Sequence, residues 1–304
     1  MRQAYRPTLV IVLAMLLVPC QNIAVAAAGT TQPPVGAAAP DEAALDASWA
    51  QVLNDSIPTA QRQQALSRIE QAAQATGNQH ELYLLGSLYH MGEHAHGSFV
   101  PRDLIKASLY LGNAATRGSV RAMAKMAEVE LAMHEYREAM NWAQIYGHYE
   151  LLLPHGVRPH HGYAAELVQR IADKLGRSTM PEIMSDVNSF IASNDAAIRA
   201  GNGGASAPNG LMPWPESKAF LPPSGRLAPR AGFADYLLAF NRDGSLADMW
   251  LLDAVPDPPL GLALRQYARE MVVAPMPAGA GPALRYAWLP MAYDDGRYRA
   301  GLIH

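Results

Sequence analysis

Cysteine is nearly absent from this sequence of 304 residues: it occurs once, at Cys20, and no thiol follows it. A disulfide scaffold, a cysteine metal site and a cysteine nucleophile are therefore excluded downstream of that position. Lysine is also scarce, and the 24 basic residues stand against 27 acidic ones, for a formal net charge of −3. A nucleic-acid binder needs a concentrated positive surface to displace counterions, so that class is excluded too.

Catalytic and nucleotide-binding motifs are missing as well. The sequence contains no Gly-x-Ser-x-Gly nucleophile, phosphate loop, dinucleotide fingerprint or His-Glu-x-x-His zinc motif. The glycine-rich run at residues 201–206 has no strand before it, and the neighbouring Asp294 and Asp295 suit a turn better than an acid/base pair. We therefore expect a non-enzymatic protein, without catalytic residues, cofactor-binding residues or metal ligands, and without a cofactor.

Histidines leave one alternative open. His90, His94 and His96 fall within one short stretch, which is predicted to be a loop because Gly92 interrupts the helix. Three such imidazole nitrogens could bind zinc. A metal-binding accessory protein of the cell wall is therefore kept as an alternative function.

The first 28 residues predict a secretory signal peptide. Arg2 and Arg6 form the positive end, residues 9–18 form a short apolar core, and residues 24–28 offer small side chains for cleavage. An uncleaved membrane anchor is the alternative, but the apolar run is about half of the roughly 20 residues that a span requires. We therefore expect a periplasmic protein whose mature chain begins near Gly29.

Four segments follow the signal peptide. Residues 29–40 are small, polar and proline-containing, which suits a flexible lead-in, whereas apolar residues recur at helical spacing over residues 41–199. Residues 200–232 are dense in glycine and proline, as in a linker. Residues 233–304 predict a strand, strand, helix, strand unit with a turn at Asp243-Gly244. The expected fold class is a two-domain α+β protein.

The helical segment contains an internal repeat. Gln64-Ala65, Lys106-Ala107 and Glu138-Ala139 share one register, and the first two are followed by paired alanines and then by Gly77 and Gly118. Alanine lets neighbouring helices approach closely, and glycine ends a helix in the left-handed conformation. This pattern predicts stacked helix pairs.

The middle unit resembles the Sel-like repeat, an α/α repeat related to the tetratricopeptide repeat. The matching stretches are Leu85-Gly86-Ser87-Leu88-Tyr89, Gly92, residues 100–103, Lys106-Ala107, Leu109-Tyr110, Ala114-Ala115 and Gly118. The resemblance covers about residues 60–150 and implies a short superhelix whose concave groove binds a peptide or protein. With so few units, the alternative is a groove that only packs the flanking helices.

The C-terminal segment resembles the C-terminal domain of TonB-type energy transducers. The matching stretches are residues 236–246, the helix at residues 262–269 leading into residues 272–275, and the strand at residues 285–293. The resemblance implies a TonB-like fold. It also makes energy transduction for outer-membrane transport an alternative function.

A sheet of this kind offers a second surface for a partner. An exposed strand edge can accept an extended peptide as an additional strand, and Tyr286 and Trp288 would flank that edge if the last strand is terminal. The alternative is that both are core residues against the helix. We therefore predict an exported protein-interaction or adaptor protein of the bacterial cell envelope, which binds a protein or peptide, no nucleic acid, and spans no membrane after signal cleavage.

Overall fold

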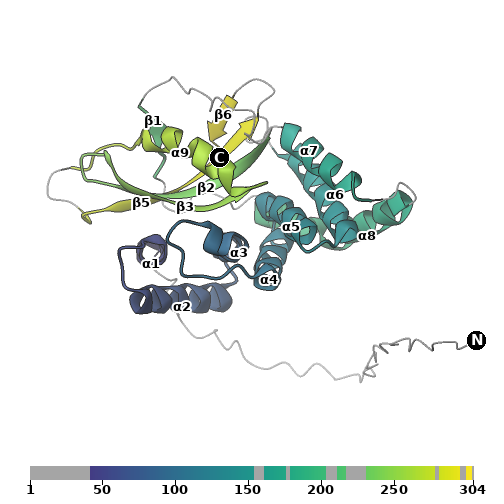
Figure 1. Cartoon of the computed structure of the whole chain (residues 1–304), viewed down its shortest axis with the longest axis horizontal. Helices are drawn as coiled ribbons and strands as arrows, with labels where there is room; N and C mark the ends of the chain where they lie inside the picture. The colour runs from purple at the N-terminus through teal and green to yellow at the C-terminus, as the bar shows by residue number, and fades with distance from the viewer. Residues whose placement is uncertain are drawn as a thin grey trace, which may run out of the picture. The chain divides into compact units, whose positions relative to one another are not determined.

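The computed structural model describes residues 42–153, 161–175, 179–202, 211–216, 231–277, 281–294 and 299–302 (Figure 1). The predicted signal peptide and lead-in, and most of the predicted linker, lie outside these residues. The described elements are, in chain order, α1 (Glu42–Leu53), α2 (Thr59–Thr76), α3 (Gln79–Met91), the 3-10 helix η1 (Gly92–His94), α4 (Leu104–Thr116), α5 (Val120–Ala132), α6 (Tyr136–Leu152), α7 (His161–Ala172), α8 (Met180–Asn202), β1 (Trp214–Pro215), β2 (Ala231–Phe240), β3 (Leu246–Val255), α9 (Pro258–Arg269), β4 (Met271–Val272), β5 (Arg285–Asp294) and β6 (Arg299–Leu302).

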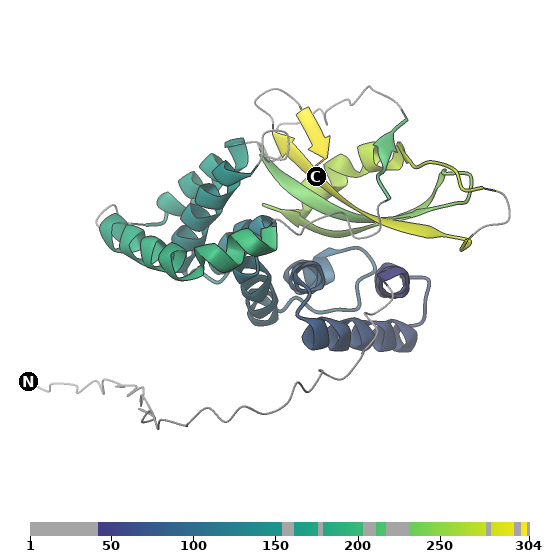
Figure 2. The same cartoon turned by 180° about the vertical axis from the view of Figure 1, so that it is seen from behind.

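Four strands form an antiparallel sheet in the order β3-β2-β5-β6, and β1 pairs with β4 in a separate two-stranded sheet. The chain follows the predicted order of strand, strand, helix and strand, with β6 and the short pair added. Side chains alternate along β2, so that Phe233 and Leu237 lie in one core while Tyr236 and Leu238 lie in another. The helix α9 covers the second of these faces (Figures 1 and 2).

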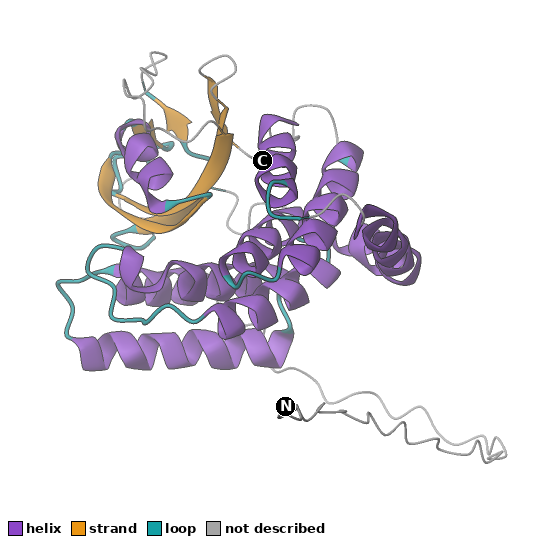
Figure 3. Cartoon of the chain, turned by 45° about the vertical axis from the view of Figure 1, so that its right-hand side comes forward, coloured by secondary structure: helices purple, strands orange, loops and turns teal. Residues whose placement is uncertain are grey.

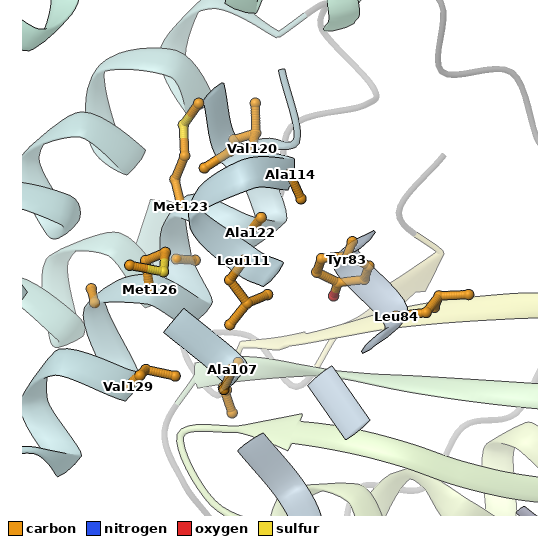
Figure 4. Packing of buried hydrophobic residues seen from close by; sticks show 14 of the residues in the cluster. Tyr83, Leu84, Ala107, Leu111, Ala114, Val120, Ala122, Met123, Met126 and Val129 are labelled. Atoms are coloured by element: carbon orange, nitrogen blue, oxygen red, sulfur yellow. The ribbon is translucent and has the colours of Figure 1, made fainter. Parts of the chain in front are cut away.

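Consecutive helices of the first part pack in pairs, α1 with α2, α3 with α4 and α5 with α6. Small residues allow the close approach: a Cβ placed on Gly86 of α3 would lie 2.5 Å from Leu111 Cγ of α4. Figure 4 shows Leu111 in this core, together with Ala107 and Ala114 of its own helix and Met123 of α5. The predicted combination of a helical repeat and a small sheet is therefore confirmed.

The helices and the sheet share one buried core. Phe233 and Leu237 of β2, with Leu252 and Val255 of β3, belong to the same apolar cluster as the buried residues of the helices. The helix α3 contacts β3, α7 contacts β2, and α1 contacts three strands, so the strands lie over the first helices of the pairs (Figure 3). The side of the repeat that these helices form is thus covered by the chain's own sheet.

Three helix ends show how the repeat turns. The helices α2 and α4 end at Gly77 and Gly118, with φ angles of 61° and 102°, as the glycine pattern predicts. At the end of α5 the same left-handed position is taken by His134, with φ of 65°. There the N–H of Glu135 donates to the carbonyl of Glu130 at 2.9 Å. This is the hydrogen bond of the Schellman motif, in which glycine usually occupies the left-handed position.

The variant His134→Gly is expected to raise the free energy of unfolding by about 0.5–1 kcal/mol. In the left-handed conformation a residue with a Cβ is destabilised by roughly 1–2 kcal/mol, and glycine removes this strain. Part of the resulting gain is cancelled, because glycine cannot keep the contact of His134 Nδ1 with the Tyr136 hydroxyl at 3.0 Å. Urea unfolding of the two proteins measures the difference. His96→Gly is the control. Because His96 has no positive φ, glycine there relieves no strain and only makes the unfolded chain more flexible, so this variant should unfold more easily than the wild type. Equal losses of unfolding free energy in both variants would contradict the expectation.

Candidate functional site

One face of α3 carries polar side chains where core residues would be expected. His80, Tyr83, Ser87 and His90 follow one another at spacings of three, four and three residues, which places them along one side of a helix. This side meets the sheet: the Tyr83 hydroxyl donates to Asp235 Oδ2 at 2.5 Å. At the other end of the helix, His90 Nδ1 lies 3.0 Å from an oxygen of Asp253.

Lys125 of α5 lies at the centre of this contact and has no solvent exposure. Its ammonium nitrogen lies 2.7 Å from Asp235 Oδ2, 2.7 Å from Asp253 Oδ2 and 2.7 Å from Ser87 Oγ, so all three N–H groups have an acceptor. Arg121, one turn earlier on α5, donates to Asp235 Oδ1 at 3.0 Å. We call this group the polar seam; it comprises Tyr83, Ser87, His90, Arg121, Lys125, Asp235 and Asp253.

The charges of the polar seam balance. Two cations, Arg121 and Lys125, face two carboxylates, Asp235 and Asp253, and both carboxylates are almost completely buried. Buried charges cost much free energy unless they are paired and hydrogen-bonded. Here each charge is paired, which identifies the seam as a specific contact between helices and strands.

The pairing is strong enough to reverse the effect of burial on pKa. Burial alone raises the pKa of Asp253, but the charge of Lys125 and the hydrogen bond with His90 outweigh it and lower that pKa to about 2. Burial alone lowers the pKa of Lys125, and the two carboxylates more than reverse this, so the ammonium form is favoured. Burial together with Asp235 raises the pKa of Tyr83, which therefore stays a hydroxyl donor.

Acid is expected to weaken the fold through Asp253. Because its pKa in the folded chain lies below that of a free aspartate, near 3.9, its stabilising effect is complete above that value and is lost as the pH falls towards 2. Urea unfolding should show a loss of about 2 kcal/mol between pH 6 and pH 2.5. Asp253→Asn removes the titrating group and should flatten this dependence; an equally steep profile in the variant would contradict the assignment.

A second buried ion pair joins α5 to α7. Glu128 accepts a hydrogen bond from the Tyr163 hydroxyl at 2.5 Å and pairs with Arg170 through both carboxylate oxygens. The ring of Tyr163 meets the ring of Phe233 edge-on, with centroids 5.5 Å apart. The helix α7 is thus fixed to α5 and, through Tyr163, to the first residues of β2.

The polar seam suits docking better than chemistry. Ser87 and Lys125 form a pair that can activate a nucleophile in other settings, but both have no solvent exposure and Asp253 beside them has none either. Every charged group in the seam is already bonded to another group of the chain. The seam therefore holds the sheet on the helices and leaves no reacting position for a substrate atom.

The structure corrects the prediction for the histidines. His90 does not lie on a loop, because α3 continues to Met91 and Gly92 only ends it, and the His90 side chain is turned to Asp253. His94 and His96 are exposed on the segment that follows, with His96 3.6 Å from a carboxylate oxygen of Asp55. The described part of the chain contains no group of three histidine, cysteine or acidic side chains arranged to hold a metal ion.

Tyr286 and Trp288 lie on the face of β5 that packs against the helical repeat. The indole N–H of Trp288 donates to Asp46 Oδ1 of α1 at 3.1 Å, and its ring meets that of Trp49 edge-on at 5.6 Å. The structure therefore favours the alternative in which both are core residues, although the helices they contact are those of the repeat and not α9. The strand β5 is also not terminal, since β6 pairs with its last four residues.

One side of β5 is nevertheless open over part of its length. Within the described residues, β2 pairs with all of β5 but β6 pairs only with residues 291–294, so residues 285–290 have a neighbour on one side only (Figure 2). We call this stretch the β5 edge. It contains Pro290, and a proline fits a strand where its nitrogen faces away from the neighbouring strand. Because the backbone direction alternates, the N–H and C=O groups of Tyr286 and Trp288 share that open side.

The opposite edge of the sheet, along β3, is better protected. The N–H of Met249 is hydrogen-bonded to Asp248 Oδ1 at 2.8 Å, and the N–H of Ala254 to Asp253 Oδ1 at 2.9 Å. Acidic side chains on an edge strand also hinder pairing with another chain. The β5 edge is therefore the better site for an added strand.

The sequence held a signal for the polar seam that motif searches do not use. Lys125 interrupts a run of alanine and methionine in α5, and Asp235 and Asp253 each interrupt an apolar strand. A charge at such a position must find a partner in the core. Which partner it finds depends on how the strands dock on the helices, and spacing within one element gives no information about that.

Comparisons with known proteins add little to this description. No protein family model matches the sequence, and no curated protein matches it. Among solved structures, the chain is similar to a protective antigen of uropathogenic Escherichia coli with an SLR fold, at 15% identity and a TM-score of 0.36. The match covers 52% of this chain and 33% of that protein, so the chain spans about a third of its length. In the described residues no helix is long and apolar enough to cross a bilayer.

Proposed function

We propose that this chain is a non-enzymatic protein-interaction protein that binds an extended segment of a partner as an added strand on the β5 edge. The observation that carries the proposal concerns the part of the chain that the structure describes: there, residues 285–290 of β5 pair with β2 on one side and with no strand on the other. Strand addition gives affinity through main-chain hydrogen bonds and specificity through alternate side chains.

The buried polar seam supports the same choice. It joins the sheet to α3 and α5 of the helical repeat, so this side of the two helices is occupied by the chain's own strands. In this proposal the repeat acts as a rigid support. The helix α1, which lies beneath β5 in both views of the chain (Figures 1 and 2), holds Trp288 in place through Asp46.

The proposal includes export to the bacterial periplasm, which rests on the signal-like sequence of residues 1–28. Energy transduction of the TonB type remains a second candidate, favoured by the order β2, β3, α9, β5. It requires an anchored N-terminus, so N-terminal sequencing of the exported protein separates the two. A mature N-terminus near Gly29 supports the adaptor, and a retained N-terminus supports the transducer.

Two variants at one position test the edge directly. Peptides selected from a random display library on the purified chain should bind the wild type and the variant Tyr286→Ala, which keeps the backbone N–H. Tyr286→Pro removes that donor and should bind about two- to tenfold more weakly than Tyr286→Ala, as expected for one lost hydrogen bond. Equal binding by both variants, or no selected peptide at all, would contradict strand addition at this edge.

A further inference from the structure

The outer face of α4 exposes two large apolar side chains. Ile105 and Leu109 are 65% and 63% exposed, and they lie one turn apart on the same side of the helix. The opposite side of α4, with Ala107 and Leu111, is buried against α3 and α5. A single exposed leucine is common on a protein surface, but two on adjacent turns form a continuous apolar strip. We call Ile105 and Leu109 the α4 strip.

Carboxylates border the α4 strip on the side of α5 and α6. Ser108 of α4 donates a hydrogen bond to Glu130 Oε1 of α5 at 3.2 Å. Burial and the charges of Glu138 and Glu135 raise the pKa of Glu130, which means that the three carboxyl groups lie close enough to repel one another. Glu135 and Glu138 are both exposed at the beginning of α6. We call these three glutamates the acidic border.

Two basic residues near the strip are bound to other groups. Arg137 of α6 lies 2.7 Å from Asp186 Oδ2 and 3.1 Å from Glu182 Oε2, both on α8. Lys106 of α4 lies on the other flank of the strip, where its nitrogen is 4.6 Å from the centre of the Tyr89 ring. Within the described residues, the side of the strip that faces α5 and α6 therefore has a net negative charge.

We propose that the α4 strip binds an amphipathic helix of a protein partner, with apolar side chains one turn apart and lysine or arginine beside them. A helix fits because its own side chains at positions i and i+4 have the spacing of Ile105 and Leu109. The acidic border attracts the basic residues of such a partner and repels an acidic one. A second copy of this chain fits less well, because two facing α4 strips would bring two acidic borders together. The site is separate from the β5 edge and does not depend on the proposed function.

Three helical peptides of about 18 residues test the proposal by titration calorimetry on the full chain. The first has leucine on one face and lysine beside it, the second has glutamate in place of lysine, and the third has alanine in place of leucine. The first should bind at least about tenfold more tightly than either of the others, because it alone supplies both the apolar contact and the opposite charge. No binding of the first peptide, or equal binding of either of the others, would overturn the proposal.

Matched variants locate the binding on the α4 strip. Ile105→Gln combined with Leu109→Gln keeps good helix formers and should weaken binding of the first peptide at least about tenfold. Leu262→Gln on α9 is the control, because Leu262 is 62% exposed and should leave the affinity unchanged. Thermal unfolding checks that the variants are folded. Wild-type affinity in the double variant would overturn the proposal.

Removal of charge tests the acidic border. Glu135→Gln combined with Glu138→Gln should weaken binding of the first peptide about three- to tenfold and reduce its dependence on salt. Asp173→Asn combined with Asp248→Asn removes the same charge from exposed positions elsewhere and should leave the affinity unchanged. Equal losses in both double variants would mean that the whole chain attracts the peptide, and would overturn the assignment to this border.

Discussion

The variant Lys125→Met is expected to lose at least about 3 kcal/mol of unfolding free energy, the largest effect of any single substitution considered. Methionine fills a similar volume but supplies no charge and no N–H donor, so Asp235 and Asp253 would stay buried without their shared partner. Removing one member of a buried ion pair costs about 3–5 kcal/mol, because an uncompensated charge remains in the core. Urea unfolding at pH 7 measures the change.

Two further proteins make this result specific. Lys174→Met replaces an exposed lysine after α7 and should change the unfolding free energy by less than about 0.5 kcal/mol. Adding Asp253→Asn to Lys125→Met removes one of the two carboxylates that have lost their lysine partner. The double variant should therefore be more stable than the sum of the two single effects predicts. A loss below about 1 kcal/mol for Lys125→Met would mean that the polar seam is not a structural contact.

Replacing Gly86 by alanine is expected to cost about 2 kcal/mol, although alanine normally stabilises a helix. The added Cβ would lie 2.5 Å from Leu111 Cγ and 3.0 Å from the backbone nitrogen of Leu111. Leu111 has no solvent exposure, so it has no room to move away, and extra atoms in a packed core cost about 1–3 kcal/mol. Thermal or urea unfolding gives the difference from the wild type.

Gly147 provides the matched control. It lies inside α6, and a Cβ added there would meet no atom within 4 Å. Gly147→Ala should therefore stabilise the protein by about 0.5–1 kcal/mol, the usual gain from alanine in a helix interior. Opposite signs for the two glycines would confirm that α3 and α4 are held together by close packing. A gain from Gly86→Ala would refute it.

Local patterns predicted the elements of this chain well. The alanine and glycine spacing predicted the helix pairs and two of the three left-handed helix ends, because these features depend on residues a few positions apart. The alternation around Asp243-Gly244 likewise predicted β2 and β3. His134 shows the limit of such patterns. It adopts a left-handed conformation that favours glycine, and no neighbouring residue in the sequence predicts this conformation.

Contacts between distant elements could not be predicted in the same way. Tyr83 and Asp235 are 152 positions apart, and Lys125 and Asp235 are 110 apart, so their pairing depends on how the sheet docks on the helices. The sequence pattern predicts two modules and a linker, and nothing in that pattern indicates that the strands pack on the helices in one shared core. For the same reason, His90 was expected on a loop although it faces a buried carboxylate.

Native-state hydrogen exchange tests the central claim, that the helices and the sheet form one unit joined by the polar seam. The account predicts that the slowest amides of α5 and of β2 open with the same free energy in the wild type, and that Lys125→Met lowers both by the same amount. If β2 opened at a free energy about 2 kcal/mol or more below that of α5, or if Lys125→Met affected only one of them, the sheet would be an independent module and the claim would be contradicted.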